Sequence, residues 1–112
     1  MTWFKVDDKL HEHKKVRRMG HDLAAVGLWT LSGSWCGGER TDGFVPASIP
    51  RRWTSPSRLA TLADKLVVVG LWEPAEVDGE RGWVFHDWED YNPLEEDTSS
   101  DVGRRRWSRK NA

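Results

Sequence analysis

The sequence is poor in several residue types and patterns, and each shortage narrows what the chain can be. Cys36 is the single cysteine, which excludes a disulfide within the chain and favours a reducing compartment. No stretch approaches the run of about 20 apolar residues that a membrane-spanning helix needs. The first residues also lack the charged-then-apolar plan of a secretory signal. We therefore expect a cytoplasmic protein that does not enter a membrane.

Patterns typical of enzymes and metal sites are missing as well. His86-Asp87 resembles half of a catalytic pair, but no serine or cysteine nucleophile motif accompanies it. The glycine-rich segment 33–38 lacks the Lys-Ser/Thr pair of a phosphate-binding loop. No metal-ligand spacing such as Cys-x-x-Cys or His-x-x-x-His relates Cys36 and the four histidines, His11, His13, His21 and His86. We expect neither an enzyme nor a bound metal or cofactor.

Tryptophan, in contrast, is abundant, at eight of the 112 residues. A buried tryptophan removes a large apolar area from water, so most of them are expected to build the core of one small domain. One or two exposed tryptophans would instead mark a binding surface.

The formal net charge is only −1, but the charges are separated along the chain. Residues 1–60 carry 10 Lys/Arg and 6 Asp/Glu, residues 61–98 carry 2 and 11, and residues 99–112 carry 5 and 1. This separation predicts two surfaces of opposite sign, suited to two different partners or to one asymmetric partner.

Apolar periodicity predicts two principal helices. The clearer one spans 56–69, with Ser55 as its N-cap and Gly70 at its end, on the stripe Leu59, Leu62, Ala63, Leu66 and Val69. The other spans 22–36, capped by Asp22 and ended by Gly37-Gly38, on the stripe Ala24, Leu28, Leu31 and Trp35. Small residues in this second helix, Gly27 and Ser32 to Ser34, predict that another element packs closely against it.

Shorter elements are predicted around these helices. Acidic residues at its start and basic residues at its end predict a helix at about 8–18, ended by Gly20. Residues 44–45 are predicted as a very short strand, and residues 46–53 as a short helix interrupted near Pro50. Two aromatic-rich strands around the turn Asp78-Gly79 predict a hairpin at 71–85.

The order of these elements predicts the fold. The helices predicted at 46–53 and 56–69 are joined by a short turn, as in a helix-turn-helix. The hairpin predicted at 71–85 follows them and makes the arrangement a winged helix. We therefore predict a mostly α fold with a small β-hairpin, a winged helix-turn-helix of the α+β class. Residues 1–94 are expected to form this domain with an N-terminal helical extension. Residues 95–112, almost without apolar side chains, are expected to be a disordered tail with a basic end.

Four stretches also carry a family resemblance: Trp3 to Asp8, Thr41-Asp42-Gly43-Phe44-Val45-Pro46, Leu66-Val67-Val68-Val69-Gly70-Leu71-Trp72, and Phe85-His86-Asp87-Trp88 through Tyr91-Asn92-Pro93. Over about residues 2–93 the chain resembles small winged-helix proteins of actinobacterial phages and mobile elements. More loosely, it is similar to the N-terminal domains of phage replication-initiation and primosome proteins. The resemblance implies DNA binding in a replication or transcription-regulation module, in the cytoplasm of a bacterial host.

Candidate DNA contacts follow from the helix predicted at 56–69, because the second helix of a helix-turn-helix is the one that enters the DNA groove. With its apolar stripe in the core, the helix exposes Ser57, Arg58, Thr61 and Lys65. Arginine pairs with guanine edges, threonine contacts thymine methyl groups, and serines at a helix start suit a phosphate. The complete set of candidates is Arg51, Arg52, Ser55, Ser57, Arg58, Thr61, Lys65, Lys14, Lys15, Arg17 and Arg18. An ordinary solvated helix face is the alternative, and a homodimer stays open because many helix-turn-helix proteins bind DNA as dimers.

The hairpin predicts a different role, because Glu73, Glu76, Asp78 and Glu80 surround a single Arg81. DNA phosphates repel such a loop, so we expect DNA to contact the helices and not the hairpin. The alternative function is a protein-binding adaptor or inhibitor of a host or phage protein. Its docking surface is predicted to combine the hairpin carboxylates with exposed aromatic side chains, namely Glu73, Glu76, Trp72, Trp83 and Trp88.

The predicted tail contains the basic segment 104–110, in which Trp107 is the one aromatic residue. Counterion release favours its non-specific binding to duplex DNA, and Trp107 suits stacking on a base of single-stranded DNA. A tail that only keeps the protein soluble is equally consistent with this composition, and both interpretations stay open.

Overall fold

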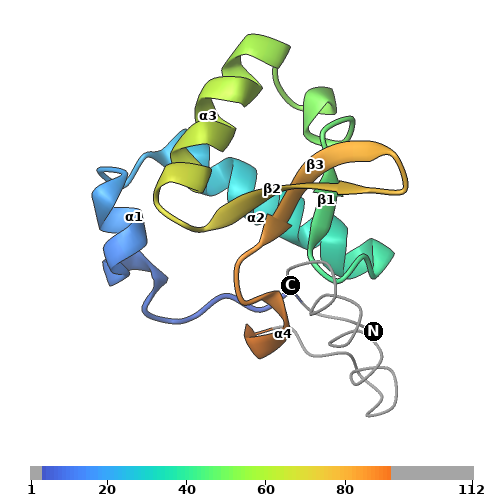
Figure 1. Ribbon diagram of the computed structural model, residues 1–112. Coiled ribbons are helices and arrows are strands. Elements are labelled where there is room, and N and C mark those ends of the chain that lie inside the picture. The colour runs from blue at the N-terminus through green and yellow to red at the C-terminus, as the bar shows by residue number, and fades with distance from the viewer. Residues whose placement is uncertain (1–3, 92–112) are drawn as a thin grey trace.

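A three-stranded antiparallel sheet packs against two long helices in the computed structural model, which describes residues 4–91 (Figure 1). The predicted tail at 95–112 lies outside this range. The elements, in chain order, are η1 (Leu10–Glu12), α1 (Lys14–Arg18), α2 (Leu23–Glu39), β1 (Phe44–Pro46), η2 (Pro50–Arg52), α3 (Pro56–Val68), β2 (Trp72–Val77), β3 (Glu80–Phe85) and α4 (Trp88–Tyr91). The chain is therefore an α+β domain, as predicted. No helix among the described residues has the length and apolar character to cross a membrane.

The sheet has the strand order β1-β3-β2 with both neighbouring pairs antiparallel. The hairpin turn lies at Asp78-Gly79, as predicted, and both residues have positive φ (52° and 82°), which suits the tight turn between two right-twisted strands. Gly82 of β3 pairs with Pro46 of β1, and a Cβ at Gly82 would lie 2.1 Å from the carbonyl oxygen of Val45. Glycine at this position therefore lets β1 approach β3.

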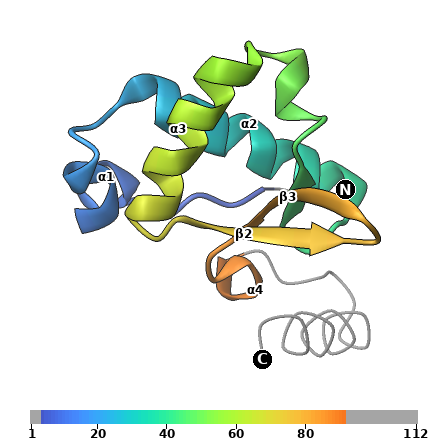
Figure 2. The ribbon, with the colours of Figure 1, turned by 45° about the horizontal axis from the view of Figure 1, so that its top comes forward.

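The main core lies between α2, α3 and one face of the sheet (Figure 2). Leu59, Leu62, Ala63 and Leu66 of α3 are buried, which confirms the predicted stripe. The helix contributes this face to the core, together with Trp72 and Phe85 from the hairpin strands. Aromatic packing continues to the end of β3, where Phe85 meets Trp88 edge to face with the ring centroids 5.2 Å apart.

The close packing predicted for the small residues of α2 is correct at Gly33, which accommodates the N-terminal segment, and wrong at Gly27, where an added Cβ meets nothing within 4 Å. The ring of Phe4 lies over Gly33, where an added Cβ would come within 2.2 Å of the ring. Phe4 also stacks on Trp88 at a centroid distance of 5.6 Å and contacts Trp29 at 5.4 Å. The glycine thus makes room for an aromatic cluster that connects the chain start to the end of the sheet.

The apolar stripe and the C-terminal end predicted for the helix at 22–36, which is α2, were partly wrong. Leu31 is 52 % exposed, whereas the buried positions include Ala25, Ser32 and Cys36, so the buried face is turned relative to the predicted one. Leu28 is buried as predicted, and the rest of the buried face consists of small residues, among them Gly33 beneath the ring of Phe4. The helix also continues through Gly37-Gly38 to Glu39, and Arg40 ends it in the left-handed conformation with φ 58°.

Two other predicted helices are shorter or divided. The helix predicted at 8–18 consists of η1 and α1, because extended His13 separates them and its Nδ1 accepts the backbone N–H of Lys15 as the cap of α1. The helix predicted at 46–53 reduces to the single turn η2. Its first residue, Pro46, belongs to β1 because it pairs with Gly82.

The other face of the sheet carries a second, smaller apolar cluster. Phe44 and Val84, opposite each other in β1 and β3, are only 7 % and 5 % exposed, with Ala75 and Val77 packed against them. In Figure 2, α2 and α3 lie on one side of the strands, and α4 lies near the other side at the end of β3. We call this face, which neither α2 nor α3 covers, the open face of the sheet; Ala75 and Val77 are its partly exposed apolar residues, whereas Phe44 and Val84 are buried.

Candidate nucleic-acid interface

Helix α3 presents the residues predicted to contact DNA, and its start is set by local contacts. The Ser55 hydroxyl accepts the backbone N–H of Arg58 at 3.2 Å, which confirms Ser55 as the N-cap. Pro56 occupies the first turn, where its missing N–H costs nothing. The Thr61 hydroxyl donates to the Ser57 carbonyl oxygen, which leaves the Thr61 methyl group free to contact a partner.

The sequence predicted that four side chains of α3 share one exposed face, and the structure brings them together. Ser57, Arg58, Thr61 and Lys65 line a shallow cleft between α3 and the start of α2, where Asp22 and Ala24 form the other wall. All four α3 side chains are exposed, since the opposite side of the helix is in the core. Asp22 also caps α2, as predicted, by accepting the Ala25 backbone N–H at 3.1 Å.

Lys65 is not a free cation in this cleft, because its ammonium group forms a hydrogen-bonded ion pair with the Asp22 carboxylate. The hydrogen bond from Lys65, together with the backbone N–H of Ala25, lowers the pKa of Asp22 below its usual value. The pair joins residues 43 positions apart and was not foreseen from the sequence. The middle of the α3 face is therefore close to neutral, and Arg58 is the remaining cation of the cleft.

Further predicted contacts lie at the two ends of α3. Arg51 and Arg52 are the last two residues of η2, residues 53–55 separate them from α3, and both are exposed. At the other end, Lys15 of α1 donates to the carbonyl oxygen of Gly70 at 3.0 Å, which holds α1 beside the end of α3. Lys15 is thus a structural contact, whereas its neighbours Lys14, Arg17 and Arg18 are exposed. Within residues 4–91 no ion pair engages the side chains of Arg51, Arg52, Arg58, Lys14, Arg17 or Arg18.

The predicted exposure of the hairpin side chains was correct for the carboxylates and wrong for two of the three tryptophans. Glu73 and Glu76 are exposed, and Glu76 lies 3.7 Å from Arg81. Trp72, in contrast, is fully buried and Trp88 is 7 % exposed, because both rings pack into the aromatic core around Phe85. Trp83 is half-buried and stacks on Trp72 with the ring centroids 5.2 Å apart.

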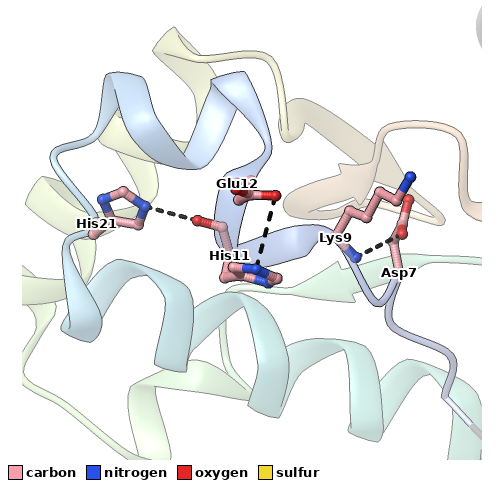
Figure 3. Close-up of polar contacts among 5 residues, drawn as sticks. All are labelled: Asp7, Lys9, His11, Glu12 and His21. Atoms are coloured by element: carbon pink, nitrogen blue, oxygen red, sulfur yellow. Dashed lines mark hydrogen bonds and ion pairs between the residues drawn. The ribbon is translucent and has the colours of Figure 1, made fainter.

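The histidines take part in local contacts in the N-terminal segment and at the hairpin end. His21 bonds through Nε2 to the carbonyl oxygen of His11 at 2.8 Å, and the His11 ring lies 3.9 Å from the Glu12 carboxylate (Figure 3). In the same segment, Asp7 accepts the backbone N–H of Lys9 at 2.9 Å. His86 lies 3.0 Å from Asp87, and both side chains are exposed. Among residues 4–91, no three His, Cys, Asp or Glu side chains come together as a metal site requires.

Sequence reasoning missed one exposed aromatic residue beside the predicted DNA contacts. Trp53 follows η2 directly and is 41 % exposed. The neighbouring arginines in Arg51-Arg52-Trp53 were the available signal, because basic residues next to an aromatic are typical of nucleic-acid contacts.

Comparison with known proteins gives no match: no family model, no curated protein and no solved structure is similar to this chain.

Proposed function

We propose that this protein is a winged-helix protein that binds double-stranded DNA through α3. The observation that carries the proposal is the order α2, β1, η2, α3, β2, β3 together with the sheet order β1-β3-β2. In this arrangement α2 supports α3, η2 stands in for the first helix of the helix-turn-helix, and the β2–β3 hairpin is the wing. The resemblance noted in the sequence, rather than the geometry, supports a role in a phage or mobile-element replication or regulatory module.

The dimensions of α3 suit the major groove. Its 13 residues make a helix of about 20 Å, and the groove is about 12 Å wide between phosphate backbones. Arg51 and Arg52 precede one end, and α1, with Lys14, Arg17 and Arg18, lies beside the other. Cations at both ends of a groove-binding helix reach the phosphates on either side, while Arg58 and Thr61 face the base edges.

Salt dependence is the first test of this proposal. If each of the five end cations contacts one phosphate, the slope of log K against log salt is about −4.5. Affinity for a random fluorescent duplex then falls about 500-fold between 50 and 200 mM salt. The variant R51A/R52A is expected to bring the slope to about −2.7, because it removes two of the five phosphate contacts.

Arg81→Ala is the matched control, since Arg81 is an exposed cation on the wing. Its removal should leave the slope unchanged if the wing stays away from DNA. Equal effects of R81A and R51A/R52A would contradict binding through α3. A chain that shows no anisotropy change at 50 mM salt does not bind duplex DNA as proposed.

A second candidate function is a protein-binding adaptor, favoured by the wing surface. Ala47, Pro74 and Trp83 form the apolar part of a groove that Glu76 and Arg81 also line. Such a groove, with carboxylates beside it, fits an apolar side chain on a basic partner surface. The duplex titration separates the two functions, because an adaptor that acts only through the wing shows no salt-dependent binding to the duplex.

A further inference from the structure

The open face of the sheet has the composition of a covered surface. In β1 all three residues are buried, although successive side chains of a strand point to opposite faces. Val45 points into the main core, whereas Phe44 points to the open face with Val84 opposite it. Strands that are apolar on both faces are typical of sheets covered on both sides. Helices α2 and α3 cover only one side (Figure 2).

Carboxylates border this face. By strand register, Glu73 is opposite Val84 and Glu80 is opposite Val77, so both glutamates point to the open face. Glu76 is opposite Arg81 and points to the other face, with its carboxylate 3.7 Å from the Arg81 side chain. A segment that covers the open face therefore needs apolar area in its middle and positive charge around it.

The chain itself contains such a segment. Residues 104–110 have five basic side chains around Trp107, and they follow α4 by 12 intervening residues. Helix α4 ends near the open side of the sheet (Figure 2). The 13 residue steps from Tyr91 to Arg104 span at most about 45 Å, and a six-residue strand is about 20 Å long. The segment can thus reach any part of the open face.

We propose that the basic segment 104–110 docks on the open face of the sheet in the same molecule, with Trp107 against Ala75 and Val77 and its cations beside Glu73 and Glu80. The tether raises the effective concentration of the segment to the millimolar range, so a weak contact is sufficient. The docking assigns the tail to the protein's own surface and does not depend on DNA binding. It also offsets the negative charge of the wing.

The test is paramagnetic relaxation with a spin label at S108C in the full chain. The buried Cys36 thiol donates to the Phe44 carbonyl oxygen and is shielded from the labelling reagent. Amide signals of Ala75, Val77 and Val84 are expected to lose at least half of their intensity, whereas signals in α3, on the other side of the sheet, lose less. The effect should be independent of protein concentration and should fade at 1 M salt, where the Debye length is about 3 Å.

Two charge variants provide the matched comparison. E73Q/E80Q removes the carboxylates of the open face and is expected to restore most of the intensity, whereas E76Q removes a charge from the other face and should change nothing. W107A tests the apolar part of the contact and should weaken the effect as well. The three glutamates are exposed and Trp107 lies outside the described residues, so the fold tolerates these changes.

Three results would overturn the docking. Broadening that appears only when labelled and isotope-enriched copies are mixed shows contact between two molecules. Equal broadening in E73Q/E80Q and E76Q shows that the open face is not the docking surface. Removal of residues 99–112 that lowers the salt slope of DNA binding shows that the segment contacts phosphates instead. Loss of DNA binding itself tests only the proposed function and leaves the docking result intact.

Discussion

The contact between Phe4 and Gly33 predicts opposite effects for two glycine-to-alanine changes in the same helix. In α2, a Cβ at Gly33 would lie 2.2, 2.4 and 2.7 Å from three ring carbons of Phe4, so the ring must move. A Cβ at Gly27 meets nothing within 4 Å. Both changes bring the higher helix propensity of alanine, about 1 kcal/mol. Only the change at Gly33 disturbs the aromatic cluster.

The magnitude follows from the packing of Phe4. Replacing a fully buried phenylalanine by alanine costs about 3–5 kcal/mol, and the half-buried ring of Phe4 represents roughly half of that. Expulsion of the ring by G33A, less the gain in propensity, leaves a net loss of about 1 kcal/mol. G27A should instead gain up to about 1 kcal/mol. In a domain of this size each kcal/mol shifts Tm by about 4–8 °C.

Thermal and urea unfolding of G33A, G27A, F4A and F4A/G33A measure these differences. Once Phe4 is alanine, G33A has no ring to displace and should stabilise the protein as G27A does. The sign of the Gly33 effect is therefore expected to reverse between the two backgrounds, which a general loss of helix stability does not produce. Equal Tm values for G33A and G27A in the wild-type background would refute the packing of Phe4 on α2.

Two further predictions concern titratable groups of the core and the cleft. Burial raises the pKa of the Cys36 thiol to about 12. An aromatic disulfide reagent at pH 8 should therefore react with Cys36 only after the protein unfolds. Reaction in the native protein at the rate of a free thiol would contradict the burial of Cys36. Hydrogen bonds from Lys65 and Ala25 lower the pKa of Asp22 in the folded protein. The ion pair of Asp22 with Lys65 therefore stabilises the fold above the ordinary aspartate pKa, near 3.8. This stabilisation disappears as the pH falls through the lower folded-state pKa. Urea unfolding from pH 6 to 2 should show this loss in the wild type and a smaller one in D22N; parallel pH profiles would contradict it.

Local patterns predicted α3 almost residue by residue, because its apolar stripe and its N-cap, Ser55, lie within 15 consecutive positions of the sequence. The buried face of α2 was misjudged because contacts with distant parts of the chain set it: Phe4 packs on Gly33, and the Cys36 thiol donates to the Phe44 carbonyl oxygen of β1. The exposure of Trp72 was misjudged for a similar reason. Strand register sets which face of the hairpin is buried, and the register with β1 is a long-range property.

In the candidate interface, too, local sequence patterns predicted which side chains share a face, whereas long-range contacts were not predicted. Helical spacing was sufficient to place Ser57, Arg58 and Thr61 on one exposed face. The ion pair of Lys65 required the position of α2 relative to α3, which no local pattern contains. Lys15 likewise looked like any other residue of the basic run, although the end of α3 uses its ammonium group.

The ion pair between Asp22 and Lys65 leads to a prediction that links the cleft to the proposed function. Asparagine is as good an N-cap as aspartate, so D22N keeps the start of α2 while it releases Lys65. If α3 lies in the DNA groove, the released ammonium adds one phosphate contact and makes the salt slope steeper by about 0.9. Affinity should then rise by up to about tenfold at 50 mM salt.

Control variants separate this effect from a general gain in positive charge. D64N removes an exposed carboxylate of the same helix that makes no ion pair within the described residues, so it should change the slope little. K65Q alone should weaken binding only slightly, because Asp22 already occupies the ammonium group, and D22N/K65Q should cancel the gain of D22N. If D22N and D64N raise the affinity equally, Lys65 does not contact DNA, and the centre of α3 contributes only through Arg58 and Thr61.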